Sequence, residues 1–199
     1  CFLDDDSYPD KNWLKNIVLN IELQRLLKYE NKIFDFFEHH CIISEQDRDF
    51  IPHAQNQKIA VIKNGVDFDF YTPKESQKKY DVLFSGHLNY PPNIVSVKFL
   101  VEEVFPLLKQ KQANISILIA GAEPSEDILK LKQPGVEIIG WVDDIRTCYY
   151  DSKIFVAPMK ISIGLQNKLL QALSMKIPCV TTPLANNALY RDRYSILDS

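Results

Sequence analysis

The sequence predicts an α/β fold in which a parallel sheet is flanked by helices. In the second half of the 199-residue chain, short apolar runs alternate with longer segments that have the periodicity of helices. Such alternation is typical of parallel strands joined by crossover helices, as in Rossmann-like domains. The apolar fraction of 46% and the charged fraction of 25% are ordinary for a globular protein and sufficient for a packed core.

Residues 1–76 are expected to form a separate part of the chain. Leu and Phe recur at spacings of three and four residues from about Lys11 to His40, which predicts helix. Short strands are expected at Cys41–Ser44 and Ile59–Ile62, with Ser44 a candidate helix cap. The polar stretch Thr72–Lys79 is the best linker candidate, so we place the boundary between residues 76 and 77.

Residues 77–199 are expected to carry the sheet. The strand-like runs are Val82–Ser85, Ile115–Ala120, Val136–Ile139, Ile154–Ala157 and Cys179–Thr181. The helices between them are expected at Asn93–Lys109, Ser125–Leu131, Asp144–Asp151 and Gly164–Met175. Ligands of parallel sheets bind beyond the carboxyl ends of the strands, so the loops that follow these runs are the candidate site.

The stretch Ile154–Thr182 is the most informative about function. It reads as a strand, a loop that contains glycine, a helix and a second strand. The start of a helix leaves N–H groups unpaired and carries partial positive charge, which favours anions. Gly164 permits close backbone approach, and Lys160 and Lys168 add positive charge. We therefore expect a phosphate-bearing ligand at this loop.

Phrases along most of the chain resemble group 1 (family four) glycosyltransferases of the GT-B fold. The matching phrases are NGVDFDFY (Asn64–Tyr71), FSGHLNYPPN (Phe84–Asn93), FLVEEVFP (Phe99–Pro106), ILIAGAEP (Ile117–Pro124), GWVDD (Gly140–Asp144), VAPMK (Val156–Lys160) and GLQNKLLQALSMKIPCVTT (Gly164–Thr182). KYENKIFDFFEHHCIISEQD (Lys28–Asp47) resembles the end of the family's N-terminal domain. The subgroup of bacterial surface-polysaccharide synthesis is most similar.

The resemblance implies a retaining, metal-independent transferase that moves a sugar from a nucleotide-diphosphate sugar to an acceptor hydroxyl. The donor would bind the C-terminal domain, and a saccharide or lipid-linked acceptor the N-terminal domain. The chain starts with Cys1 rather than Met, so we expect a fragment that lacks most of the N-terminal domain and the C-terminal tail. No cofactor besides the donor substrate is expected. The resemblance identifies no catalytic residue.

The resemblance also implies which residues bind the donor. Backbone groups of Gly86 and Gly164–Asn167 (Gly164, Leu165, Gln166, Asn167) would face phosphate, with the side chains of Lys160 and Lys168 neutralising it. His87, Asn89 and Gly121 would lie nearby, and Val142 beside the base. Gln171 stands where relatives usually carry a Glu that holds the ribose, and Ile163 where a second Glu is common. A neutral bond at Gln171 predicts weaker donor binding or an altered donor preference.

Each of these residues also has a purely structural interpretation. Gly121 is equally consistent with a tight turn at the end of a strand. Gly86 can also be explained by such a turn, and Lys160 and Lys168 by solvated surface charges, but for these three residues we favour the site. For Asn93 and Asp144 we favour helix capping. Asp4–Asp6 and His39–His40 have no convincing metal partner, so no metal site is predicted.

Composition restricts partners and compartment. The net charge of −3 argues against general nucleic-acid binding, which requires a basic face. The four cysteines show no CxxC pairing, and Cys41 and Cys179 are expected to be buried in a reduced, cytoplasmic protein. Peripheral contact with the inner membrane is expected only through the missing N-terminal part.

Two alternatives to a transferase remain open at this point. A non-catalytic module that binds nucleotide-sugars would explain why Gln171 and Ile163 replace the usual acids. A nucleotide-sugar epimerase of similar two-domain architecture would need acidic catalytic residues facing the sugar, and the sequence shows none.

Overall fold

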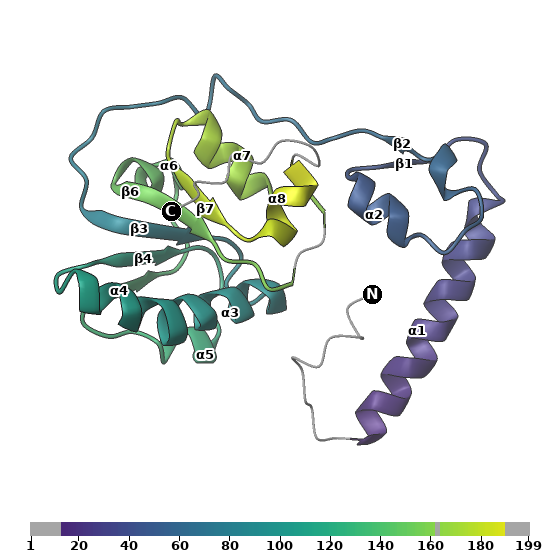
Figure 1. Ribbon diagram of the computed structural model, residues 1–199, viewed down its shortest axis with the longest axis horizontal. Coiled ribbons are helices and arrows are strands. Elements are labelled where there is room, and N and C mark those ends of the chain that lie inside the picture. The colour runs from purple at the N-terminus through teal and green to yellow at the C-terminus, as the bar shows by residue number, and fades with distance from the viewer. Residues whose placement is uncertain (1–12, 162–163, 190–199) are drawn as a thin grey trace. The chain divides into compact units, whose positions relative to one another are not determined.

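The computed structural model of the chain describes residues 13–161 and 164–189, with side chains from residue 16 (Figure 1). Asp4–Asp6 and Ile163 lie outside the described residues. The chain divides into two compact units, Cys1–Lys63 and Asn64–Ser199. The division after Lys63 lies earlier in the chain than the expected boundary between residues 76 and 77.

The first unit combines one long helix with a small parallel sheet. Helix α1 spans Trp13–Phe34, and strands β1 (Cys41–Ile42) and β2 (Ala60–Val61) pair in parallel. Between them lie helix α2 (Glu45–Phe50) and the 3₁₀ turn η1 (Asn56–Lys58). No helix among the described residues is both long and apolar enough to cross a membrane.

Two local features of the first unit were only partly predictable. Ser44 caps α2 as expected, because its Oγ accepts a hydrogen bond of 3.0 Å from the Asp47 N–H. The predicted helix to His40 instead ends at Phe34, whose ring stacks on the imidazoles of His40 and His53 at centroid distances of 3.8 and 3.9 Å. His40 therefore packs within a cluster of rings.

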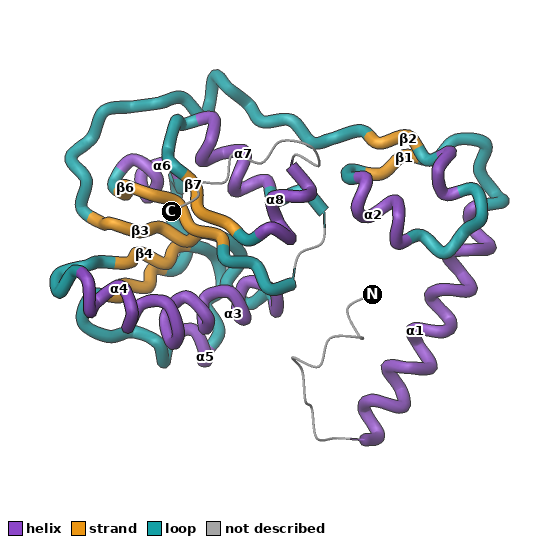
Figure 2. Tube along the Cα trace, viewed as in Figure 1, coloured by secondary structure: helices purple, strands orange, loops and turns teal. Residues whose placement is uncertain are grey.

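The second unit contains a five-stranded parallel sheet in the order β5-β4-β3-β6-β7 (Figures 1 and 2). The strands are β3 (Tyr80–Ser85), β4 (Ile117–Ala120), β5 (Val136–Ile139), β6 (Ser152–Ala157) and β7 (Cys179–Thr181). All four pairings are parallel, with Leu83 of β3 opposite both Leu118 and Phe155. The sheet order confirms the expected α/β class, because β3 lies at the centre and later strands are added on both sides.

One continuous helical stretch follows β3 and contains a wider turn. Helix α3 (Pro91–Lys98) runs through a π-helical segment, η2 (Phe99–Val104), into α4 (Phe105–Lys111). The N–H of Phe105 bonds to the carbonyl of Leu100, five residues earlier. Pro106 lacks an N–H and its ring would clash with the carbonyl four residues before it, so we attribute the wider turn to Pro106.

The remaining helices are short. They are α5 (Glu126–Leu129), α6 (Arg146–Tyr150), α7 (Asn167–Ser174) and α8 (Pro183–Leu189). The first three lie within their predicted ranges, whereas α8 was not predicted.

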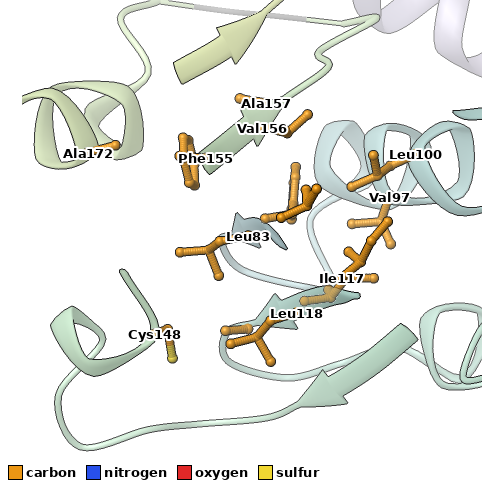
Figure 3. Packing of buried hydrophobic residues seen from close by; sticks show 14 of the residues in the cluster. Leu83, Val97, Leu100, Ile117, Leu118, Cys148, Phe155, Val156, Ala157 and Ala172 are labelled. Carbon is orange, nitrogen blue, oxygen red and sulfur yellow. The ribbon is translucent and has the colours of Figure 1, made fainter. Parts of the chain in front are cut away.

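Apolar side chains pack on both faces of the sheet. Figure 3 shows Val97 and Leu100, from α3 and η2, facing Ile117, while Ala172 of α7 lies on the side of Phe155. Successive residues of a strand point to opposite faces, so a run such as Phe155–Ala157 contributes to both layers. This two-sided burial explains why these strands read as continuous apolar runs.

Residues 64–78, part of which was expected to be a linker, pack onto the second unit. Ser174 Oγ donates to the Tyr71 carbonyl at 2.7 Å, and the Tyr150 hydroxyl donates to the Thr72 carbonyl at 3.1 Å. The Arg146 guanidinium donates to the Phe70 carbonyl at 3.0 Å and lies 3.8 Å from the Phe70 ring. These contacts explain why the division falls before this segment rather than within it.

The three described cysteines, Cys41, Cys148 and Cys179, are free thiols. Cys148 is buried and Cys179 half-buried, and burial raises the pKa of the Cys179 thiol to about 12. Cys41 is exposed, so its expected burial was wrong. Its strand is only two residues long and lies in the smaller unit, where little packs over it.

Candidate functional site

The carboxyl ends of β3 and β4 approach each other at two glycines. A Cβ atom added to Gly121, whose φ is +151°, would lie only 1.7 Å from the carbonyl oxygen of Gly86. A Cβ on Gly86 would lie 2.8 Å from Asn93 Nδ2. Gly121 is therefore needed for the backbones of the two loops to pass this closely, whereas Gly86 leaves room for the side chain of Asn93.

Asn93 connects the loop after β3 to helix α7. It is the third residue of α3 and is 6% exposed. Its Nδ2 donates to the His87 carbonyl at 2.9 Å, and its Oδ1 accepts from Lys168 Nζ at 2.7 Å. The expected capping role was wrong, because Tyr90 occupies the N-cap position and Asn93 lies inside the helix.

Lys168, in the first turn of α7, carries an ammonium that has only neutral neighbours. Its Nζ lies 2.7 Å from Asn93 Oδ1 and 4.4 Å from the centre of the Phe84 ring. Burial lowers the pKa of Lys168 to about 7. Within residues 16–161 and 164–189, no carboxylate lies within 4 Å of this ammonium. An anionic ligand would supply the missing counter-charge.

The loop before α7 brings backbone groups to the same region. Gly164 has φ of +64°, a left-handed conformation that favours glycine. Leu165 is buried in the apolar core, so its backbone alone can face a ligand. Gln166 is the N-cap residue of α7, and Asn167 Oδ1 accepts a hydrogen bond of 3.0 Å from Asn64 Nδ2.

The ammonium groups of Lys160 and Lys168 have different neighbours in the structure. Its Nζ lies 3.2 Å from Glu103 Oε1 and 4.0 Å from the centre of the Phe99 ring. Both partners belong to η2, whereas the partners of Lys168 are Asn93 and Phe84. Lys160 therefore already has an acidic partner, and Lys168 is the stronger candidate for binding phosphate.

The remaining predicted residues lie at other places along the same edge. His87 and Asn89 are exposed in the loop after β3, and His87 Nε2 lies 3.5 Å from Glu123 Oε2. Val142 is half-buried after β5 and packs against the core. Asp144 accepts from the N–H of Arg146 at 3.0 Å and forms an ion pair with its guanidinium at 2.7 Å. The Arg146 contacts hold the pKa of Asp144 below its usual value.

Gln171 faces a buried tyrosine that the sequence did not identify. The Tyr149 hydroxyl lies 2.8 Å from Ser85 Oγ, 3.3 Å from the Lys168 carbonyl and 3.4 Å from Gln171 Oε1. Tyr149 is fully buried, and burial raises the pKa of its hydroxyl above the usual range. An aromatic residue in a short helix is normally part of the core, so no sequence signal distinguished Tyr149.

The described residues contain no cluster of three or more His, Cys, Asp or Glu that could hold a metal ion. Positive charge at this edge of the sheet comes from Lys168 and from the first turn of α7, whereas α3 begins with Pro91 and Pro92, which have no N–H to donate.

Solved structures share the fold of this chain. TarM is 21% identical, with a TM-score of 0.61, over 79% of this chain and 31% of TarM. A glycosyltransferase from Rickettsia africae ESF-5 is 18% identical, with a TM-score of 0.59, over 80% of this chain and 48% of that protein. Anabaena Alr3699/HepE, in complex with UDP and glucose, is 15% identical, with a TM-score of 0.61, over 79% and 48%.

The chain thus spans about a third to a half of the length of these proteins. A comparison with curated proteins finds no match. The family model described as "Glycosyl transferases group 1" matches residues 79–196, which is more than half of the chain. Together with the parallel sheet and the arrangement around β3 and α7, this match shows that the chain belongs to the group 1 glycosyltransferases.

Proposed function

We propose that the second unit binds the diphosphate of a nucleotide-sugar. We further propose that the complete protein transfers the sugar to an acceptor hydroxyl. The transfer would retain the configuration of the sugar and would need no metal. The observation that carries this proposal is the half-buried ammonium of Lys168, which lies between the first turns of two helices with only neutral contacts. Such an arrangement stabilises an anion through charge and through backbone N–H groups together.

Backbone and side-chain groups have distinct roles in this proposal. The glycines at 86, 121 and 164 let the donor approach the backbone, while Lys168 neutralises phosphate. The N–H groups at Leu165–Asn167 would donate to phosphate oxygens at the start of α7. Val142, which packs against the core, would lie beside the base. Gln171, on the same face of α7 as Lys168, would accept from the ribose.

Structures with the same fold support this class of donor and acceptor. Anabaena Alr3699/HepE was solved with UDP and glucose, and a mutant of S. aureus TarM with fondaparinux, alpha-GlcNAc-glycerol and UDP. We infer that the complete protein uses a nucleotide-diphosphate sugar and a saccharide or lipid-linked acceptor, in the synthesis of a bacterial polysaccharide or glycoconjugate.

Thermal unfolding with UDP, GDP, ADP and their sugars tests donor binding. We expect one diphosphate to raise the melting temperature of the wild type, and Lys168→Ala to lose that shift. Lys111→Ala, which removes an exposed lysine at the end of α4, is the matched control and should keep the shift. No response of the wild type to any nucleotide would contradict the proposed site.

A non-catalytic nucleotide-sugar binding module is the second candidate. Gln171 favours it, because an amide stands beside the Tyr149 hydroxyl where a carboxylate would be expected in a transferase. Donor hydrolysis or sugar transfer by the complete reading frame separates the two functions. Activity that persists in EDTA, with an α-linked product from an α-linked donor, would support the retaining, metal-independent mechanism.

A further inference from the structure

A cavity lies at the edge of the sheet opposite the proposed donor site, where the strands begin. It has a volume of about 570 Å³, within the range of small-molecule sites. Its lining comes from the segment before β3, the start of β6 and the turn between α7 and β7. The proposed donor site lies beyond the carboxyl ends of these same strands, so the cavity is separate from it.

The charges around this cavity are mainly positive. Lys74, Lys78, Lys153 and Lys176 line it together with one acidic residue, Glu75. Lys153 is neutralised by Asp81, whose Oδ1 lies 2.7 Å from its Nζ. Lys153 is therefore the member of the group that already has a counter-charge.

Neutral groups contact two of the other three lysines. Lys78 Nζ donates to the Tyr150 carbonyl at 2.8 Å, and Lys74 Nζ lies 5.7 Å from the centre of the Tyr150 ring. In the part of the chain that the structure describes, no carboxylate lies within 4 Å of Lys74, Lys78 or Lys176. These exposed lysines leave an excess of positive charge at the cavity, which a ligand of opposite charge would offset.

Lys176 has an unusual backbone for a lysine. It follows the C-cap residue of α7, Met175, and its φ is +56°. This left-handed position at the end of a helix is usually occupied by glycine, because other side chains are strained there. Replacing this lysine by glycine would therefore remove its charge without straining the backbone.

Apolar groups lie beside the lysines. Met175 and Ile177 are buried, and Pro73 and Pro178 also line the cavity. We propose that this cavity binds a phosphate-bearing ligand, with Lys74, Lys78 and Lys176 around the phosphate and the apolar groups against the adjoining part. The phosphate can belong to a free phosphate compound or to the headgroup of an acidic lipid. The proposal does not depend on donor binding at Lys168.

The experiment uses the Lys168→Ala background, which removes the ammonium of the proposed donor site. Inorganic pyrophosphate is titrated by calorimetry, and vesicles of phosphatidylcholine with or without phosphatidylglycerol are tested by co-sedimentation. Lys176→Gly is added as the test variant and Lys111→Gln as a control with the same loss of charge. Glycine suits the left-handed backbone, so Lys176→Gly should keep the melting temperature of its background.

We expect pyrophosphate or phosphatidylglycerol vesicles to bind, and Lys176→Gly to weaken that binding about fivefold, the effect of one lysine near a phosphate surface. Binding of pyrophosphate alone would identify a free phosphate compound as the ligand. Binding of vesicles alone would identify a lipid headgroup. If neither probe binds, or if Lys111→Gln weakens binding as much as Lys176→Gly, the proposal is overturned.

Discussion

Lys168 Nζ and Asn93 Oδ1 lie 2.7 Å apart, although the two residues are separated by 75 positions in the chain. The bond joins the first turns of α3 and α7, which follow different strands of the sheet. It holds an ammonium at the edge where parallel sheets bind ligands, without the carboxylate that would neutralise it. The proposed donor site therefore depends on an amide in this position rather than an acid.

The affinity for a nucleotide-sugar should fall as the pH rises above 7. Burial lowers the pKa of Lys168 to about 7, so the free protein loses this positive charge above that pH. A bound diphosphate raises the pKa again, so binding takes up a proton and the affinity falls by up to ~tenfold per pH unit. Calorimetry at several pH values measures the slope. Lys168→Met should abolish it, and an equal slope in Lys168→Met would contradict this assignment.

Asn93→Asp should weaken binding of the diphosphate by at least ~tenfold, because a carboxylate 2.7 Å from Lys168 neutralises it and repels phosphate. The loss of the bond from Nδ2 to the His87 carbonyl should cost only about 1 kcal/mol of folding stability. Asn114→Asp adds the same charge at an exposed position before β4 and serves as the control. Equal affinities of the two variants would contradict a role for the pair.

The strands were predictable because apolar residues recur along them between turns. Ile117–Ala120 is fully buried, and Val136–Ile139 and Cys179–Thr181 form strands with the expected ends although Glu137 and Val180 are exposed. The π-helical segment before Pro106 was not predictable from periodicity, because it depends on how the chain accommodates a missing N–H. Helix α8 was missed although it carries a start signal, because its first residue, Pro183, directly follows Thr182.

Two residues of the candidate phosphate site could be identified from the sequence, but the contacts that its side chains make could not. Gly86 and Lys168 were identified from motifs, and both lie beside Asn93, at the carboxyl end of β3. Lys160 contacts Glu103 instead, because the partner of an exposed lysine depends on tertiary packing. Tyr149 was missed for a similar reason, since only the folded chain places its hydroxyl beside Ser85.

Gly121→Ala should lower the free energy of unfolding by roughly 2–4 kcal/mol, because its Cβ would lie 1.7 Å from a backbone carbonyl that cannot rotate away. Gly65→Ala meets nothing within 4 Å and should change stability by less than about 0.5 kcal/mol. Urea denaturation of both variants measures the difference. A small effect at Gly121 would show that β3 and β4 can separate at this edge at little cost.

Tyr149→Phe should cost about 1–2 kcal/mol, because it leaves the buried Ser85 hydroxyl without its partner at 2.8 Å. Adding Ser85→Ala should restore part of this loss, since the double variant contains no unpaired hydroxyl. A double-mutant cycle by urea denaturation measures the coupling. Strictly additive effects would show that the two hydroxyls do not stabilise each other.

Gln171→Glu should increase the affinity for UDP about fivefold. A bond from a ribose hydroxyl to a carboxylate contributes about 1.5–3 kcal/mol, against about 0.5–1.5 kcal/mol for a bond to an amide. The longer contact to the Tyr149 hydroxyl, 3.4 Å in the wild type, is one that either side chain can accept. Inorganic pyrophosphate, which has no ribose, is the control ligand: it should bind the variant no more tightly, because the added charge repels phosphate. Parallel titrations of wild type and variant measure both ligands. A gain shared by pyrophosphate, or no gain for UDP, would show that position 171 does not contact the ribose.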